Sequence, residues 1–209
     1  MSTLLRIDSS PMAEGASFSR QLTAEFVEHW KRAHPDGTVI TRDVAATALR
    51  PVDAEWIGAA YTPKVSLTDH QKGVLNLSNE LIGELKAADE YVIGVAMHNF
   101  SVPGALKLWI DQIARVGETF SYEGGVPAGL LRNKTATFLV ASGGVYEKGS
   151  PAFAMNFIEP YLKSLFGFIG VTDTHFINIS GTGRHRFGMD RETIVQPAIE
   201  SVRGQLQAA

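Results

Sequence analysis

Short apolar runs alternate along this chain with longer segments that mix polar and apolar residues. Runs rich in β-branched and aliphatic residues, each of strand length, occupy residues 3–7, 38–41, 91–97, 135–140 and 175–179. Most of them are apolar at consecutive positions, which is typical of strands covered on both faces. The pattern therefore predicts five strands, most of them buried.

Between these runs, apolar residues recur at three- and four-residue spacing, as expected for amphipathic helices. Such segments cover residues 19–33, 103–115, 151–166 and 189–206, and a longer one follows Thr68 and continues to residue 88. Threonine is a common helix N-cap, and Pro103 suits a first turn. Residues 44–67, with a short helix near 56–61, and the glycine-rich stretch 117–133 interrupt the alternation.

Strands that alternate with helices form a parallel sheet with helices on both faces. We therefore expect an α/β three-layer sandwich, with residues 1–209 in a single domain. For five strands the flavodoxin-like order 2-1-3-4-5 is the natural choice. That order predicts a mononucleotide site at the carboxyl edge of the sheet, where strands 1 and 3 diverge.

Composition narrows the classes of function. The chain has 19 basic and 22 acidic residues and no basic patch, so we expect no nucleic-acid partner. No apolar run approaches the roughly 18–20 residues of a membrane span, and the N-terminus lacks the apolar core of a signal peptide. We therefore expect no membrane partner and a cytoplasmic location. Cysteine is absent and the six histidines lack ligand spacing, so disulfides, thiol nucleophiles and metal sites are not expected.

The loop after the first strand suits a phosphate group. It carries four hydroxyl side chains, at Ser9, Ser10, Ser17 and Ser19, and leads into a helix whose first N–H groups favour an anion. The loop contains no lysine, only Arg20 is close, and the P-loop motif GxxxxGK[ST] is absent. Any one such serine is more often a simple helix cap, but four around one turn favour phosphate.

Two further strand ends should meet this loop at the same edge. Met97-His98-Asn99-Phe100 follows the third strand and offers apolar surface together with one amide. Gly143-Gly144 follows the fourth strand and allows backbone N–H groups to approach a ligand closely. Taken singly, these segments are ordinary loops and turns. Together the three loops outline a site for flavin mononucleotide (FMN).

Four groups of residues resemble the FMN-dependent NADH-azoreductase family, within the flavodoxin-like quinone reductases. They are Ser9-Ser10 with 17–22, 97–100 with Leu106-Lys107 and Asp111, 114–122, and 166–170. The resemblance implies that FMN is bound by Ser10, Ser17, Phe18, Ser19, Met97, His98, Asn99, Phe100, Ala141, Ser142, Gly143 and Gly144. It also implies that Phe120 lines the substrate face. The chain departs from the family's usual sequence at Ala96 and His98, where proline and tyrosine are usual, and at Ala141-Ser142, where Ser-Arg is usual.

The resemblance further implies a reaction. A flavin carries the redox chemistry itself, so no catalytic acid–base residue is expected. NADH or NADPH would reduce the flavin in a ping-pong scheme, and a quinone or azo compound would then reoxidise it. The resemblance also implies a homodimer, and we expect residues 44–67 and 117–133 to close its interface. A flavodoxin-type electron carrier and a non-catalytic FMN-binding module stay open as alternatives.

Overall fold

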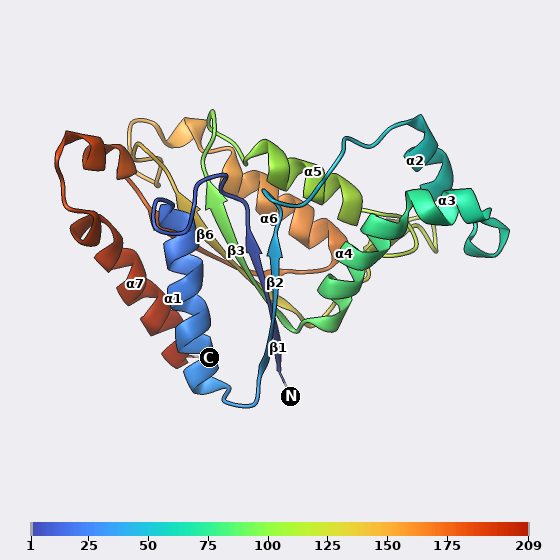
Figure 1. Cartoon of the computed structure of the whole chain (residues 1–209), viewed down its shortest axis with the longest axis horizontal. Helices are drawn as coiled ribbons and strands as arrows, with labels where there is room; N and C mark the ends of the chain where they lie inside the picture. Colours follow the sequence, from blue (N-terminus) through green and yellow to red (C-terminus); the bar gives the residue numbers. More distant parts are fainter. Residues whose placement is uncertain (1, 209) are drawn as a thin grey trace.

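A parallel sheet of five strands runs through the centre of the molecule in this computed structural model, which describes residues 2–208 (Figure 1). The strands are β1 (Thr3–Asp8), β2 (Thr38–Asp43), β3 (Glu90–Ala96), β6 (Thr135–Ala141) and β7 (Asp173–Ile179). Their order is β2-β1-β3-β6-β7, and every neighbouring pair is parallel. The predicted order 2-1-3-4-5 is confirmed.

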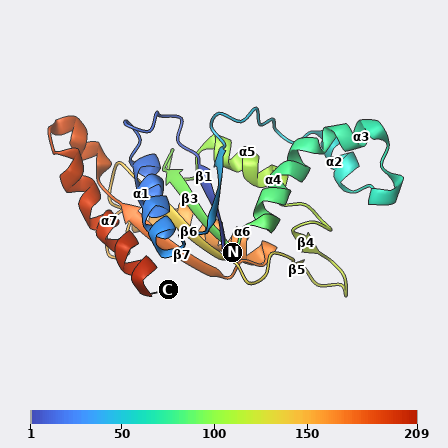
Figure 2. The same ribbon diagram turned by 60° about the horizontal axis from the view of Figure 1, so that its bottom comes forward.

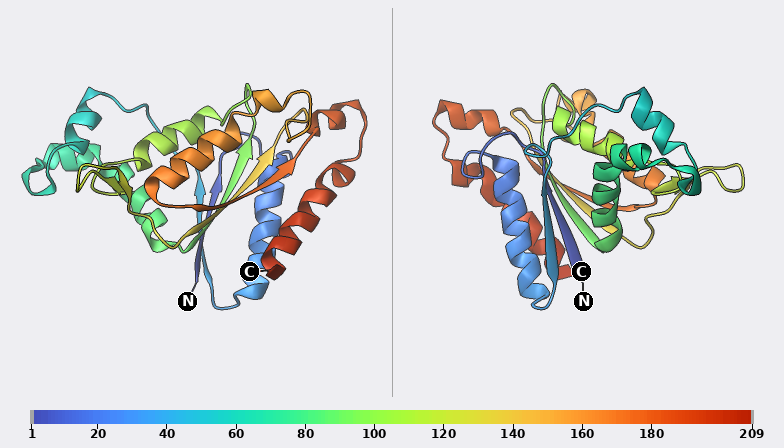
Figure 3. Two further views of the ribbon diagram at one scale, coloured as in Figure 1. Left: turned by 180° about the vertical axis from the view of Figure 1, so that it is seen from behind. Right: turned by 45° about the vertical axis from the view of Figure 1, so that its right-hand side comes forward.

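Helices cover both faces of this sheet. The helices α1 (Phe18–Ala33) and α7 (Arg191–Ala208) lie on one face, and α4 (Asn76–Ala87), α5 (Gly104–Ile113) and α6 (Ile158–Ile169) lie on the other (Figures 1 and 3). Successive strand residues point to opposite faces. Leu139 therefore packs with α1 and α7, while its neighbours Phe138 and Val140 pack with the opposite layer. The predicted three-layer sandwich is confirmed.

Two helix predictions need correction. The single helix expected over 68–88 is divided at Leu75 into α3 (Asp69–Val74) and α4, although Thr68 caps α3 as predicted. The helix expected over 151–166 begins only at Ile158, after a short 3-10 helix, η2 (Phe153–Met155). A helix beginning near residue 151 would place Pro160 in its interior, where the missing N–H group disfavours a helix, although α7 accommodates such a proline at Pro197.

The two irregular segments form structure of their own at the end of the molecule opposite α7 (Figure 2). Residues 44–67 include α2 (Ala54–Ala60), close to the predicted short helix, and the 3-10 helix η1 (Lys64–Ser66). Residues 117–133 include an antiparallel pair, β4 (Phe120–Ser121) and β5 (Ala128–Gly129). Within residues 2–208, no helix combines the length and the apolar character that a bilayer crossing requires.

Candidate functional site

A cavity of about 740 Å³ opens at the carboxyl edge of the sheet, beside β1, β3 and β6. Its volume lies within the range of roughly 300–1,000 Å³ that is usual for small-molecule sites. Eight of the residues expected to bind FMN line it: Ser10, Ser17, Phe18, Ser19, Met97, His98, Ala141 and Gly143. The three loops that the sequence placed at one edge therefore do meet around one cavity.

The other expected residues are placed differently. Asn99 and Phe100 form a tight turn with φ angles of 48° and 70°, closed by two hydrogen bonds between His98 and Ser101. Ser142 is buried and its hydroxyl donates to the Gly144 carbonyl at 3.0 Å. None of these four residues (Asn99, Phe100, Ser142 and Gly144) is among those lining the cavity. Their contact with a ligand stays a prediction.

Among the described residues, Phe120 is not one of those that line the cavity. It is on β4, where its ring packs on Phe168 with a centroid distance of 4.6 Å and meets Tyr122 edge-on. It is 7% exposed and does not line the cavity at the sheet edge. Its predicted role at a substrate face stays a prediction.

The start of α1 forms the anion-binding end of the cavity. Ser17 is its N-cap, and the Ser17 hydroxyl accepts a hydrogen bond from the Arg20 amide at 3.2 Å. Within residues 2–208, no hydrogen bond of the structure uses the amide N–H of Phe18 or Ser19. Free amides and the positive end of the helix dipole together favour a phosphate group at this position.

Arg20 fixes the loop after β1. Its Nε and Nη2 atoms donate to the Ser10 carbonyl at 3.1 and 2.6 Å, and its Nη1 atom pairs with Asp43 at 2.8 Å. Beneath the loop, burial raises the pKa of Asp8, although hydrogen bonds and charges from Thr23, Arg6 and Arg20 act in the opposite direction. The charge of Arg20 is thus already balanced by carboxylates, and its role is to hold the Ser10 backbone in place.

The cavity has a fourth wall, which was not predicted from the sequence. Thr182, Gly183, His185, Arg186 and Arg191 also line it, and all come from the segment that follows β7. The backbone amides of residues 181–183 donate to the carbonyls of residues 142–144, so the two segments are joined. A signal for this wall was present in the sequence, because Gly181-Thr182-Gly183 begins one residue after a strand whose carboxyl end lies at the same edge.

The middle of the cavity is apolar. Ala96, Met97 and Ala141 line it, and the Met97 amide donates to the Ala141 carbonyl at 2.8 Å, which fixes the ends of β3 and β6 side by side. A flat aromatic group fits such a surface, while the amides of α1 suit a phosphate. In addition, the buried Nη2 atom of Arg191 has no hydrogen-bond partner within residues 2–208. The residues present therefore fit flavin mononucleotide.

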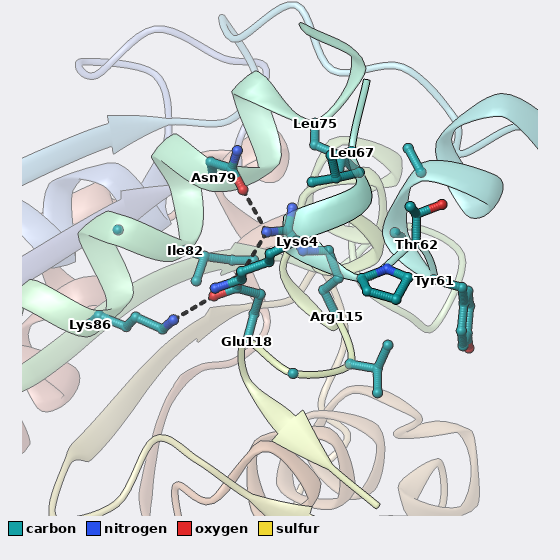
Figure 4. Close-up of a pocket in the computed structure, with 16 residues that line it drawn as sticks. Tyr61, Thr62, Lys64, Leu67, Leu75, Asn79, Ile82, Lys86, Arg115 and Glu118 are labelled. Carbon is teal, nitrogen blue, oxygen red and sulfur yellow. Dashed lines mark hydrogen bonds and ion pairs between the residues drawn. The ribbon is translucent and has the colours of Figure 1, made fainter. Parts of the chain in front are cut away.

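A second cavity, of about 650 Å³, lies between η1, α4 and the turn before β4 (Figure 4). Glu118 accepts ion pairs there from Lys64 at 2.7 Å, Lys86 at 2.6 Å and Arg115 at 3.1 Å. Burial acts to raise the pKa of Glu118, but the three hydrogen bonds outweigh it and lower that pKa to about 2. These charged groups pair with one another, so we interpret the cluster as a structural contact that joins η1, α4 and the turn before β4.

Comparison with known proteins agrees with the fold. A family model described as flavodoxin-like fold matches residues 2–206. A protein of Acidobacterium capsulatum named FMN-dependent NADH:quinone oxidoreductase is 54% identical, over 97% of this chain and 98% of its own length. FMN-dependent NADH:quinone oxidoreductase 3 of Burkholderia lata is 45% identical over the same shares.

Solved structures give a similar result. An azoreductase from Bacillus anthracis superposes with a TM-score of 0.88 and 26% identity, and all of both chains is covered. An FMN-dependent NADH-azoreductase from Bacillus anthracis, solved in complex with FMN, gives a TM-score of 0.86 and 26% identity, covering 99% of this chain and 98% of that one.

Proposed function

This chain belongs to the flavodoxin-like fold family of the FMN-dependent NADH:quinone oxidoreductases, and we propose that it is itself an enzyme of this kind. The observation that carries the proposal is the cavity at the carboxyl edge, which joins the free amides of α1 to an apolar floor. NADH is the proposed electron donor, with NADPH as a second candidate. Quinones are the proposed acceptors, and reductive cleavage of azo compounds is a further activity.

Within this cavity each wall has a different role in binding. Ser10, Ser17 and the amides of Phe18 and Ser19 would hold the phosphate of FMN, because they offer hydroxyl and amide donors at a helix start. Ala96, Met97 and Ala141 would cover the ring and exclude water from it. The Gly143 backbone would lie against the ring edge, since no side chain obstructs its approach.

FMN, when bound, would supply two-electron redox chemistry between the nicotinamide and the acceptor, for which we propose a ping-pong scheme. The protein's part is to bind the ring, orient it and leave one face open. His98 lines the cavity, and we propose that its ring covers the flavin in place of the family's usual tyrosine.

We also propose a homodimer that forms through the irregular segments. Large apolar side chains are exposed there on α2, on η1 and around the β4–β5 pair: Ile57, Tyr61, Val65, Tyr122, Val126 and Leu130. Val65 is 97% exposed, and exposed apolar side chains that gather in one region commonly mark a protein–protein interface. Phe120 belongs to the same region, so a second copy would bring it to a shared substrate site. Light scattering of the intact protein tests this proposal, and a monomer at all concentrations contradicts it.

Steady-state kinetics tests the proposed activity. The FMN-loaded protein should oxidise NADH over many turnovers when benzoquinone is present, and double-reciprocal plots at several quinone concentrations should be parallel. Replacing NADH by NADPH, and benzoquinone by an azo dye, measures donor and acceptor preference. Reduction without turnover would instead indicate an electron carrier, and the absence of any reduction by either nicotinamide would indicate a binding module.

A further inference from the structure

Arg191 is a cation without a carboxylate partner at the anion-binding end of the cavity. It is the first residue of α7, 171 positions from Arg20, yet it reaches the start of α1. Its guanidinium carbon lies 3.9 Å from the centre of the Phe18 ring, its Nε atom donates to the Gln21 side chain at 2.9 Å, and its Nη1 atom donates to the Ala16 carbonyl at 3.3 Å. All these contacts are with neutral groups.

The charge of Arg191 is therefore poorly compensated. Within residues 2–208 it forms no ion pair, although Glu14 and Glu25 line a small neighbouring cavity with it, and its buried Nη2 atom has no acceptor. Partial burial lowers the pKa of Arg191, with no carboxylate acting in the opposite direction. An unpaired charge in a partly buried position destabilises a folded protein, and an anion in the adjoining cavity would compensate the charge of Arg191.

We propose that Arg191 neutralises the phosphate of FMN and thereby makes the site select the mononucleotide over riboflavin. The inference rests on the proposed function. Arg20 cannot have this role, because Asp43 and Asp8 already balance its charge and its donors are directed to the Ser10 carbonyl. Arg186 also lines the cavity and is a second cation. Of these two arginines, Arg191 is the one whose guanidinium packs on Phe18, in the first turn of α1.

The inference is tested by titrating the apoprotein with FMN and with riboflavin at equilibrium. Quenching of the flavin fluorescence measures how much of each flavin is bound. Arg191→Gln should weaken FMN binding by about tenfold to a hundredfold, the value of one hydrogen bond to a charged group. Riboflavin lacks the phosphate, so its affinity should change by less than about twofold. Arg191→Lys should recover most of the FMN affinity, because it restores the positive charge.

Arg203→Gln is the matched control. Arg203 lies on the same helix and contacts His29, outside the cavity, so this variant should bind both flavins as the unaltered protein does. Thermal melting of each apoprotein shows that the variants fold. The inference is overturned if Arg191→Gln binds FMN with unchanged affinity, or loses FMN and riboflavin to the same extent. Failure of the unaltered protein to bind FMN would instead overturn the proposed function, and this inference with it.

Discussion

Replacing Glu118 with glutamine tests the charge cluster that joins η1 to α4 and to the turn before β4. In the structure, Lys64, Lys86 and Arg115 surround this carboxylate, whose side chain is 9% exposed. Arg115 also donates to the Ser78 hydroxyl at 2.8 Å, so it keeps a partner after the change. Glutamine has nearly the same shape but no charge, and we therefore expect a loss of stability without a cavity.

The magnitude follows from the pKa. The three cations hold the pKa of Glu118 at about 2, against an ordinary value of 4.5. A difference of this size corresponds to about 3 kcal/mol, at about 1.4 kcal/mol for each pH unit. Lys64 and Lys86 are 73% and 46% exposed, so solvent screens part of the attraction. We therefore expect Glu118→Gln to lower the free energy of unfolding by about 1–2 kcal/mol near neutral pH.

The pH dependence has a definite sign. The pKa of Glu118 is depressed by folding, so its stabilisation is complete above about pH 4.5 and is lost as the pH falls towards about 2. Glutamine does not titrate. The difference in unfolding free energy between the two proteins should therefore be largest near neutral pH and shrink steadily in acid.

Urea denaturation of both proteins, at several pH values from about 7 to about 3.5, measures this difference. Glu123→Gln is the control, because Glu123 is exposed and forms no ion pair within the described residues 2–208. A difference between Glu118→Gln and the unaltered protein that is the same at every pH would refute the reasoning, since it would show that the carboxylate charge is irrelevant.

Two further predictions concern the cavity and the packing of the β4–β5 pair. Ser17→Asp should keep the N-cap of α1, and hence the melting temperature. Its negative charge should repel the phosphate and weaken FMN binding at least about tenfold. Unchanged affinity in a fluorescence titration would place the phosphate elsewhere. Gly129→Ala should cost about 3 kcal/mol or more in urea denaturation, because a Cβ there would lie 2.1 Å from the Gly170 nitrogen. The control Gly204→Ala, at an exposed position of α7, should be neutral or stabilise by up to about 1 kcal/mol. Equal effects of the two changes would contradict the packing described here.

The sheet could be predicted from the sequence because most of its strands are nearly continuous apolar runs, which are typical of a parallel sheet covered on both faces. The division of the helix at Leu75 could not, since an apolar residue at that position continues the helical pattern. Pro160 favoured a late start of α6, but proline alone does not decide where a helix begins, because α7 contains Pro197 in its interior.

The candidate site was predictable to the extent that topology decides it. Strand order places the loops after β1, β3 and β6 at one edge, whatever their side chains. Arg191 was not found because the sequence does not show how a distant helix packs beside α1. Asn99 and Phe100 do not line the cavity, because they form a tight turn with His98 and Ser101, and their contact with FMN stays a prediction.

Binding of FMN in the cavity at the start of α1 underlies every proposed activity of the protein. The visible spectrum of the purified protein, supplied with FMN and then freed of excess, tests this binding most directly. We predict a flavin spectrum with one FMN per chain, bleached by NADH without oxygen and restored by benzoquinone. A colourless protein that retains no FMN would contradict the account.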